Sequence, residues 1–226
     1  AEADPAAIAA LNRLARGGRA LELGIGTGRF ALPLQEAGVE VHGIDASPAM
    51  VARLRAKPGG GSIPVTLGNF ADVAVEGHFS LIYIPFNTFF SLLTQEEQVR
   101  CFQNVARHLA PGGAFAIEAF VPDLTRFSSG QQTVRAVTIK EDRVQLDVSV
   151  HHPVTQRITS QHVFLAEEGI RLFPVSLRYA WPAEMDLMAR LAGLRLKHRW
   201  EDWDGGAFSA RSGMHISVYE HDRHPS

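Results

Sequence analysis

The stretch Leu21-Glu22-Leu23-Gly24-Ile25-Gly26-Thr27-Gly28 decides the fold of this chain. It places three glycines at alternate positions after an apolar strand, residues 20–23, and before a helical pattern at residues 29–36. Glycine adopts positive φ angles that other residues avoid, and it lets a ligand approach the main chain closely. The helix that follows turns its unpaired N–H groups and the positive end of its dipole toward that ligand. The stretch therefore predicts a nucleotide-type pocket at the start of an α/β domain.

Strands and helices alternate on both sides of this stretch. Strands are expected at residues 19–23, 39–44, 63–67, 79–84 and 114–120, and helices at residues 5–16, 29–37, 47–57 and 94–109. This alternation predicts an α/β fold with a doubly wound parallel sheet and right-handed crossovers. Ligands of such sheets bind at the carboxyl ends of the strands. We therefore expect one crevice, lined by the residues that follow the strand ends Leu23, Ile44, Leu67, Ile84 and Phe120.

The alternation stops near residue 131. Four segments rich in Val, Ile, Thr and Phe follow, at residues 133–140, 144–152, 157–166 and 170–179. They predict an antiparallel β-sheet of three or four strands, inserted at approximately residues 131–180 into a single domain that spans residues 1–226. A helix at residues 182–192 and strands at residues 194–201 and 215–220 are expected to complete that domain.

Composition excludes several classes of function. The 226 residues are 46% hydrophobic and 20% charged, with a formal net charge of −2, which argues against a broad electrostatic footprint for nucleic acid. No apolar run reaches the roughly 20 residues that a membrane-spanning helix needs. The single cysteine, Cys101, cannot form an internal disulfide, and no His, Cys, Asp and Glu residues have metal-site spacing. We expect a cytoplasmic protein without a nucleic-acid, membrane or metal partner.

The glycine spacing distinguishes between classes of nucleotide. A dinucleotide fingerprint needs a third glycine where this chain has Arg29, and a phosphate loop needs a Gly-Lys-Ser/Thr ending, which is absent. A glycine turn without a pyrophosphate clamp suits a ligand that has an adenosine but no phosphates.

Three motifs in this order resemble the class I S-adenosylmethionine-dependent methyltransferases of the small-molecule type. Residues 22–28 match that family's first motif, residues 41–47 match its second strand with a terminal acidic residue, and residues 110–113 match the turn before its fifth strand. The resemblance implies a Rossmann-like seven-stranded sheet, mostly parallel, whose last strand lies antiparallel between the fifth and the sixth. It implies S-adenosyl-L-methionine as the cofactor.

By the same analogy, the inserted sheet would cover the acceptor site and support a homodimer. Residues 1–18 are shorter than the N-terminal helical lid that this family usually carries. Two interpretations stay open: the lid is missing, or it never belonged to this chain.

The candidate cofactor residues have chemical reasons of their own. Asp45, at a strand end, can accept two hydrogen bonds from vicinal ribose hydroxyls; the alternative is that it caps the helix near Pro48. Glu22 either orients the glycine loop or meets the ammonium group of the cofactor, unless it is a solvated charge at the strand edge. By resemblance, Asn69 meets the adenine amine and Phe70 lies against the base, unless Phe70 belongs to the core. The predicted cofactor-binding set is Glu22, Gly24, Gly26, Thr27, Gly28, Asp45, Ala46, Met50, Asn69, Phe70 and Ile84.

The segment Ile84-Pro85-Phe86-Asn87-Thr88 follows the fourth strand, where the resemblance implies the methyl group. It lacks the D/N-P-P-Y/F signature of DNA and RNA amino-methyltransferases, which counts against base methylation. Displacement at an activated methyl group needs mainly alignment in a dry pocket, and a base only where the acceptor must lose a proton. The weak candidates for such a catalytic residue are His151, His152, Tyr179 and Glu118. The predicted substrate-binding residues are Phe86, Asn87, Phe120, Arg178, Tyr179 and Trp181.

Each of these candidates has a structural alternative. The two histidines would also suit a polar hairpin tip, and Tyr179 and Trp181 would suit packing under the following helix. With those alternatives open, the sequence predicts an enzyme, an S-adenosylmethionine-dependent methyltransferase that acts on an oxygen or a nitrogen of a small molecule. An RNA or protein methyltransferase of the same fold and a non-catalytic cofactor-binding regulator are the competing interpretations.

Overall fold

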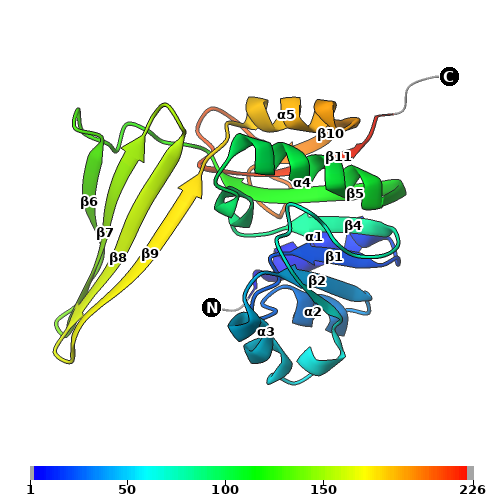
Figure 1. Ribbon diagram of the computed structural model, residues 1–226, viewed down its shortest axis with the longest axis horizontal. Helices are drawn as coiled ribbons and strands as arrows, with labels where there is room; N and C mark the ends of the chain where they lie inside the picture. The colour runs from blue at the N-terminus through cyan, green and yellow to red at the C-terminus, as the bar shows by residue number, and fades with distance from the viewer. Residues whose placement is uncertain (1–2, 223–226) are drawn as a thin grey trace. The chain divides into compact units, whose positions relative to one another are not determined.

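The computed structural model describes residues 3–222 and divides into two compact units, each with its own β-sheet (Figure 1). The larger unit comprises the described residues up to Phe89, Glu96–Val121, and the described residues from Pro182 onward. The smaller unit comprises Phe90–Gln95 and Pro122–Trp181. No helix among residues 3–222 is long and apolar enough to cross a membrane.

The larger unit is built on a seven-stranded sheet. Its strands are β1 (Ala20–Leu23), β2 (Val41–Asp45), β3 (Val65–Leu67), β4 (Phe79–Ile84), β5 (Leu109–Phe120), β10 (Leu194–Trp200) and β11 (Met214–His221). They lie in the order β10-β11-β5-β4-β1-β2-β3, and only β11 is antiparallel to its neighbours. The predicted doubly wound, Rossmann-like, mostly parallel sheet is therefore confirmed, and so is its antiparallel last strand.

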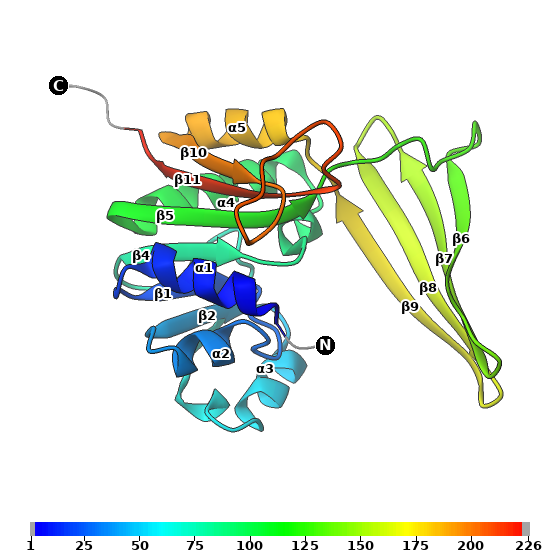
Figure 2. The same cartoon turned by 180° about the vertical axis from the view of Figure 1, so that it is seen from behind.

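Helices cover both faces of this sheet. They are α1 (Pro5–Ala15), α2 (Ala31–Glu36), α3 (Pro48–Arg55), α4 (Gln95–His108) and α5 (Pro182–Leu191), with 3₁₀ turns at Gly60–Ser62 and Thr88–Ser91. In Figure 2, α1 lies in front of β1 and β4, whereas α4 lies in front of β5 in the opposite view of Figure 1. Ala7, Leu34 and Leu54, from α1, α2 and α3, share one buried cluster with residues of the sheet. The predicted cap of α3 is present, because Ser47 Oγ accepts a hydrogen bond from Met50 N at 3.3 Å and Pro48 opens the helix.

The start of β5 differs from the sequence-based expectation. The strand was expected to begin at residue 114, after the turn at residues 111–113, but it begins at Leu109. Leu109 pairs with Phe79 directly after α4, and Ala114 then pairs with Leu81. The turn, with Gly112 at φ 75°, is an excursion inside the strand. Pairing with β4 on both sides of the turn explains the difference, since a local pattern does not contain it.

The smaller unit carries an antiparallel sheet of four strands. These are β6 (Gln132–Ile139), β7 (Arg143–His152), β8 (Arg157–Ala166) and β9 (Gly169–Arg178), paired in that order. On one face two neighbouring rows across the strands are wholly apolar: Ala136, Leu146, Val163 and Leu172, and Ile139, Val144, Leu165 and Ile170. Leu172 is 58% exposed, and Val134 and Ile170 on the same face are more exposed still. The inserted antiparallel sheet is therefore present, and it has an exposed apolar face.

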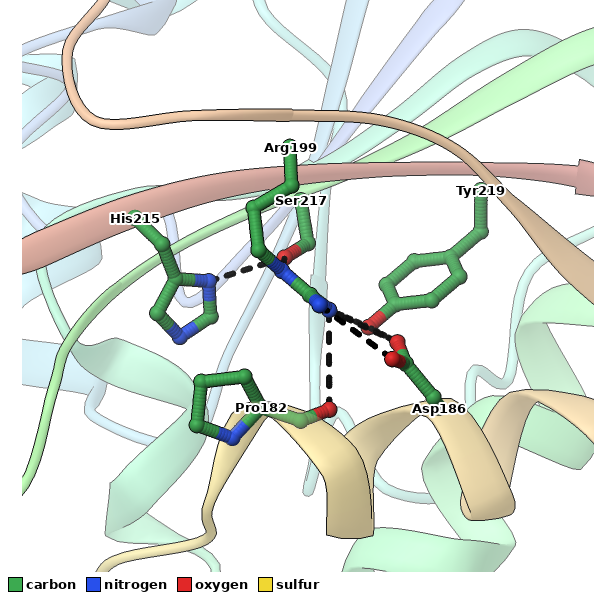
Figure 3. Close-up of polar contacts among 6 residues, drawn as sticks. All are labelled: Pro182, Asp186, Arg199, His215, Ser217 and Tyr219. Carbon is green, nitrogen blue, oxygen red and sulfur yellow. Dashed lines mark hydrogen bonds and ion pairs between the residues drawn. The ribbon is translucent and has the colours of Figure 1, made fainter. Parts of the chain in front are cut away.

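A partly buried polar network fastens α5 to the outer strands of the larger sheet (Figure 3). Arg199 of β10 donates to both carboxylate oxygens of Asp186 on α5, at 3.2 and 2.7 Å, and its Nε donates to Ser217 Oγ at 3.0 Å. Tyr219 OH donates to Asp186 at 3.0 Å, and His215 Nδ1 lies 2.8 Å from Ser217 Oγ. Burial lowers the pKa of His215 to about 4, so this imidazole is neutral at pH 7. The network thus joins helix and sheet without burying an unpaired charge.

Candidate active site

The glycine loop has the backbone that its sequence predicts. Gly24, Gly26 and Gly28 have φ angles of 78°, 55° and 75°, all in the left-handed region. At two of them a side chain would also collide with neighbours: a Cβ on Gly24 would lie 2.5 Å from Thr88 Cγ2, and one on Gly28 would lie 2.3 Å from Leu54 Cδ1. The loop therefore needs glycine both for its backbone angles and for its packing.

Asp45 braces the glycine loop from the end of β2. Its Oδ2 accepts a hydrogen bond from Gly26 N at 2.7 Å, and its Oδ1 accepts one from Ser47 N at 2.8 Å. The side-chain cap of α3 comes from Ser47, so helix capping is not the role of Asp45. A carboxylate has about four acceptor positions, and two of them are used here. The remaining two are available for the hydroxyls of a ribose.

A cavity of about 810 Å³ opens beside the glycine loop. Its predicted members are Glu22, Gly24, Gly26, Thr27, Gly28, Met50 and Phe86. The other residues that line it are Ala3, Ile25, Arg29, Phe30, Leu32, Pro33, Lys57, Pro85 and Thr88. Five predicted cofactor-binding residues are not part of that lining: Asp45, Ala46, Asn69, Phe70 and Ile84. The structure thus brings the ends of β1 and β4 together around one cavity and leaves the ends of β2 and β3 at its periphery.

Glu22 is a buried carboxyl that faces this cavity. It is only 2% exposed, which excludes a solvated strand-edge charge. Tyr83 OH donates to its Oε2 at 2.8 Å. Burial raises the pKa of Glu22 to about 8, against opposing contributions from the Tyr83 hydrogen bond and the positive charge of Arg29. A buried carboxyl that lacks a direct cationic partner suits a ligand that brings a cation into the cavity.

Asn69 and Phe70 occupy the turn after β3. Asn69 Oδ1 accepts a hydrogen bond from Ala71 N at 2.9 Å, and its Nδ2 donates to Glu97 Oε1 at 3.4 Å. Part of the acceptor capacity that was predicted for adenine is therefore used within its own turn. Phe70 is 7% exposed, and its ring lies 3.9 Å from the position that a Gly24 Cβ would take. Phe70 therefore packs behind the glycine loop, and its predicted contact with adenine stays a prediction.

The turn after β4 is held by β5. Phe86 and Asn87 have φ angles of 54° and 60°, which non-glycine residues rarely adopt. Phe86 N donates to Glu118 Oε2 at 2.7 Å, and Asn87 N donates to the main-chain oxygen of Glu118 at 3.1 Å. In return, Phe120 N donates to Asn87 Oδ1 at 2.7 Å. Four of the predicted site residues thus form one hydrogen-bonded clamp.

Arg29, Lys57 and Tyr83 are site residues that sequence reasoning missed. The guanidinium carbon of Arg29 lies 4.2 Å from the centre of the Phe86 ring, a cation–π contact at the cavity wall. Lys57 Nζ donates to Thr27 O at 2.7 Å, from beyond the end of α3. Arg29 was noticed only as a residue that excludes a dinucleotide. Nothing in the local sequence could have placed Lys57 beside the glycine loop or Tyr83 beside Glu22.

In the smaller unit, His151 and Tyr179 form a buried pair. His151 Nδ1 lies 2.7 Å from Gln131 Oε1, an atom that can only accept, so Nδ1 carries the proton and Nε2 accepts from Tyr179 OH at 3.0 Å. Phe127 stacks on His151, and burial lowers the pKa of this histidine. His151 is 4% exposed, whereas its neighbour His152 at the end of β7 is exposed, as the alternative of a polar hairpin tip implies.

Arg178 and Trp181 flank this pair along the chain. Arg178 is buried, and its Nη2 donates to Gln156 Oε1 at 3.3 Å. Trp181 is 41% exposed and touches Tyr179 edge to face, with ring centres 6.1 Å apart. Among residues 3–222, no group of three His, Cys, Asp or Glu side chains is placed to hold a metal ion.

The larger unit therefore fits a nucleoside cofactor that carries a cationic amine. The glycine loop permits close approach, Asp45 retains acceptor capacity for a ribose, and Glu22 presents a buried carboxyl to the cavity. Nothing in the loop resembles a pyrophosphate clamp, in agreement with a ligand that lacks phosphates.

The known proteins that this chain resembles in sequence are methyltransferases. Residues 20–113 match a family model described as a methyltransferase domain. The chain is 31% identical over 202 residues to the cypemycin N-terminal methyltransferase from a Streptomyces species, covering 88% of this chain and 82% of that protein. It is 31% identical over 157 residues to the dTDP-4-amino-2,3,4,6-tetradeoxy-D-glucose N,N-dimethyltransferase of Saccharopolyspora spinosa, covering 68% of this chain and 61% of that protein.

A solved structure shows the same similarity in three dimensions. The CcbJ methyltransferase from Streptomyces caelestis superposes with a TM-score of 0.90 and 41% sequence identity, covering 98% of this chain and 91% of that one. The similarity therefore includes the residues of both sheets.

Proposed function

We propose, from the premise that this chain belongs to the S-adenosylmethionine-dependent methyltransferases, that it methylates an amine nitrogen of a small molecule. The protein is an enzyme of that family, and its cofactor is S-adenosyl-L-methionine. The choice of nitrogen over oxygen comes from the two curated relatives, whose names specify an N-terminus and an amino sugar. The observation that supports the cofactor site is the buried Glu22 carboxyl, which faces a cavity beside a glycine loop of the right spacing.

In this proposal the larger unit binds the cofactor. The left-handed loop at Gly24, Gly26 and Gly28 lies against the nucleoside, and Asp45 accepts hydrogen bonds from the ribose hydroxyls. Glu22 compensates the charge of the methionine ammonium group, and Met50 packs against the base from α3. The other members of the predicted cofactor-binding set are retained in this proposal: Thr27, Ala46, Asn69, Phe70 and Ile84.

The cofactor supplies an activated methyl group, and the protein supplies alignment and the exclusion of water. Transfer would be an in-line displacement in which the acceptor nitrogen bonds to the methyl carbon as the methyl–sulfur bond breaks and sulfur leaves as a thioether, so the nitrogen must present a lone pair. An aliphatic ammonium group therefore has to lose a proton before attack. His151 and Tyr179 are our candidates for that proton acceptor, because a neutral imidazole already accepts from the tyrosine hydroxyl.

We further propose that residues 1–226 form a single methyltransferase domain in which the antiparallel insertion, approximately residues 131–180, recognises the acceptor. The candidate residues for binding the methyl acceptor are still Phe86, Asn87, Phe120, Arg178, Tyr179 and Trp181. His152 is retained as a further candidate base. The near-neutral charge supports the absence of a nucleic-acid partner, and the single cysteine fits a cytoplasmic setting.

A homodimer is part of the same proposal, and its support is the exposed apolar face of the antiparallel sheet. Val134, Ile170 and Leu172 on that face are 67%, 69% and 58% exposed. Contiguous apolar surfaces of this kind are rare on monomers. Sedimentation analysis should show a dimer for the wild type and a monomer for Leu172→Glu; a monomeric wild type would rule out the dimer.

The decisive experiment is an acceptor screen read by mass spectrometry. Purified protein and S-adenosylmethionine are incubated with amino-sugar nucleotides, with short peptides that have a free N-terminus, and with matched hydroxyl compounds. We expect a mass increase of one or two CH₂ units on amines only, and loss of product with Asp45→Ala. Methylation of the hydroxyl analogues alone would overturn the nitrogen assignment, and methylation of longer peptides alone would favour a protein substrate.

A further inference from the structure

Two consecutive non-glycine residues in left-handed backbone stand at the wall of the cofactor cavity. Phe86 and Asn87 have φ angles of 54° and 60°, directly after β4, and Phe86 lines the cavity. Such angles are unfavourable for residues with a Cβ, and they persist only where the surroundings enforce them. A specific set of contacts must therefore hold this turn.

Three hydrogen bonds connect this turn to Glu118 and Phe120 on β5. The Glu118 carboxylate accepts from Phe86 N at 2.7 Å, and the Glu118 main-chain oxygen accepts from Asn87 N at 3.1 Å. Asn87 Oδ1 accepts from Phe120 N at 2.7 Å, so the connection runs in both directions. Side chains supply two of these three bonds, which makes the clamp depend on the identity of Glu118 and Asn87.

The clamp keeps the Phe86 side chain at the surface of the cavity. Phe86 is 60% exposed, although phenylalanine is usually buried, and the guanidinium of Arg29 lies over its ring. Glu118 itself is 8% exposed, and its Oε2 already accepts from a main-chain N–H. The carboxylate is thus engaged with the backbone of the turn, which is an arrangement for positioning rather than for proton transfer.

We propose that Glu118 is a positioning residue: through the left-handed turn it sets the Phe86 ring as a wall of the cofactor cavity and thereby controls cofactor affinity. The proposal rests on the assignment of this cavity to S-adenosylmethionine, which is part of the proposed function. It replaces the expectation that Glu118 acts as a general base.

Calorimetric titration with S-adenosylmethionine tests the proposal without any knowledge of the acceptor. Glu118→Ala should weaken cofactor binding about tenfold, since it removes a charge-assisted hydrogen bond that holds the turn. Glu118→Gln should stay within about threefold of the wild type, because its amide oxygen can still accept from Phe86 N. Glu36→Ala, which changes an exposed glutamate of α2, is the matched control and should leave the affinity unchanged.

A double-mutant cycle shows whether Glu118 acts through Phe86. Phe86→Ala should weaken binding as much as Glu118→Ala does, and the double variant should be no weaker than either single variant. Melting curves establish that each variant is folded. If Glu118→Ala does not fold, Phe86→Ala and Glu118→Gln still decide the question.

Three results would overturn the proposal. They are cofactor affinity in Phe86→Ala equal to the wild type, additive losses in the double variant, and normal cofactor binding by Glu118→Gln combined with loss of methyl transfer. The last result would restore the general-base role. Absence of cofactor binding by the wild type would instead refute the cofactor assignment itself, so the two failures are distinguishable.

Discussion

The loop after β1 and the turn after β4 adopt the same left-handed backbone with opposite kinds of residue. The first uses Gly24, Gly26 and Gly28, whereas the second uses Phe86 and Asn87. Glycine takes these angles without steric cost, so the backbone angles of the first loop need no enforcement, although Asp45 fastens the loop to β2. The second turn is held to β5 by the Glu118 carboxylate, which accepts from Phe86 N, and by its own Asn87 side chain, which accepts from Phe120 N. The comparison teaches that a binding loop can be shaped by its own residues or by its neighbours, and only the former is visible in a local motif.

The largest expected effect tests the first half of this comparison. Gly24→Ala places a Cβ 2.5 Å from Thr88 Cγ2, whereas a Cβ on Gly26 has no neighbour closer than 4.0 Å. Both changes strain a positive φ, so they differ mainly in overlap. We expect Gly24→Ala to lower the free energy of unfolding by about 3 kcal/mol and Gly26→Ala by about 1 kcal/mol. Urea denaturation measures both, and equal losses would show that backbone strain alone explains the glycines.

Asp45 connects the glycine loop to β2, and its removal should have the next largest effect. Asp45→Ala deletes the acceptor for Gly26 N and the proposed acceptor for the ribose. We expect S-adenosylmethionine binding to weaken roughly 100-fold, which corresponds to two charge-assisted hydrogen bonds. Asp45→Asn, which keeps one acceptor oxygen, should lose distinctly less in the same calorimetric titration. Identical losses in the two variants would mean that the negative charge, and not the acceptor geometry, matters.

The pH dependence of stability tests the burial of Glu22 in the cavity that both loops line. Burial raises the pKa of Glu22 from 4.5 to about 8, so the folded protein binds a proton that the unfolded chain releases. Its contribution is therefore fully present below pH 4.5 and is lost as the pH rises toward and through 8, with a slope of at most about 1.4 kcal/mol per pH unit. Urea midpoints at pH 5.5 and 7.5 should differ less in Glu22→Gln than in the wild type. An unchanged difference would assign the slope to other groups.

The smallest effect concerns the strain in the second turn. Phe86→Gly and Phe86→Ala both remove the exposed ring, but only glycine removes the cost of the left-handed angle. We expect Phe86→Gly to be more stable than Phe86→Ala by about 0.5 kcal/mol, the steric gain being partly offset by the entropy of glycine in the unfolded chain. Thermal unfolding of the matched pair measures this difference. A more stable alanine variant would mean that the turn is not strained.

Much of the fold could be predicted because its signals are local. The alternation of apolar strands with helices gave the parallel sheet, and Ser47-Pro48 gave the start of α3. The β5 boundary at Leu109 could not be predicted, since it depends on pairing with Phe79 across the sheet. The same reason applies to the network of Arg199, Asp186 and His215, whose members come from three different elements, α5, β10 and β11, and meet only once these elements pack (Figure 3).

The candidate site divides along the same line. The left-handed glycine loop and the position of Asp45 beside it were predictable, because each depends on a residue type at a strand end. The partner of Glu22 was not, since Tyr83 lies on β4 and reaches the carboxyl only because β4 pairs with β1. Glu118 was noticed as a carboxylate, but its contact with Phe86 N follows from the β4 and β5 pairing.

By itself, the sequence determined the class of fold, the glycine loop and the acidic strand end that follow from short-range steric and hydrogen-bonding preferences. The tertiary structure alone decided which of the predicted residues share the cavity, which carboxyl is buried, and which residues brace the loops. The physical reason is that backbone angles depend on the residue and its immediate neighbours, whereas burial and side-chain partners depend on strands that meet only after folding.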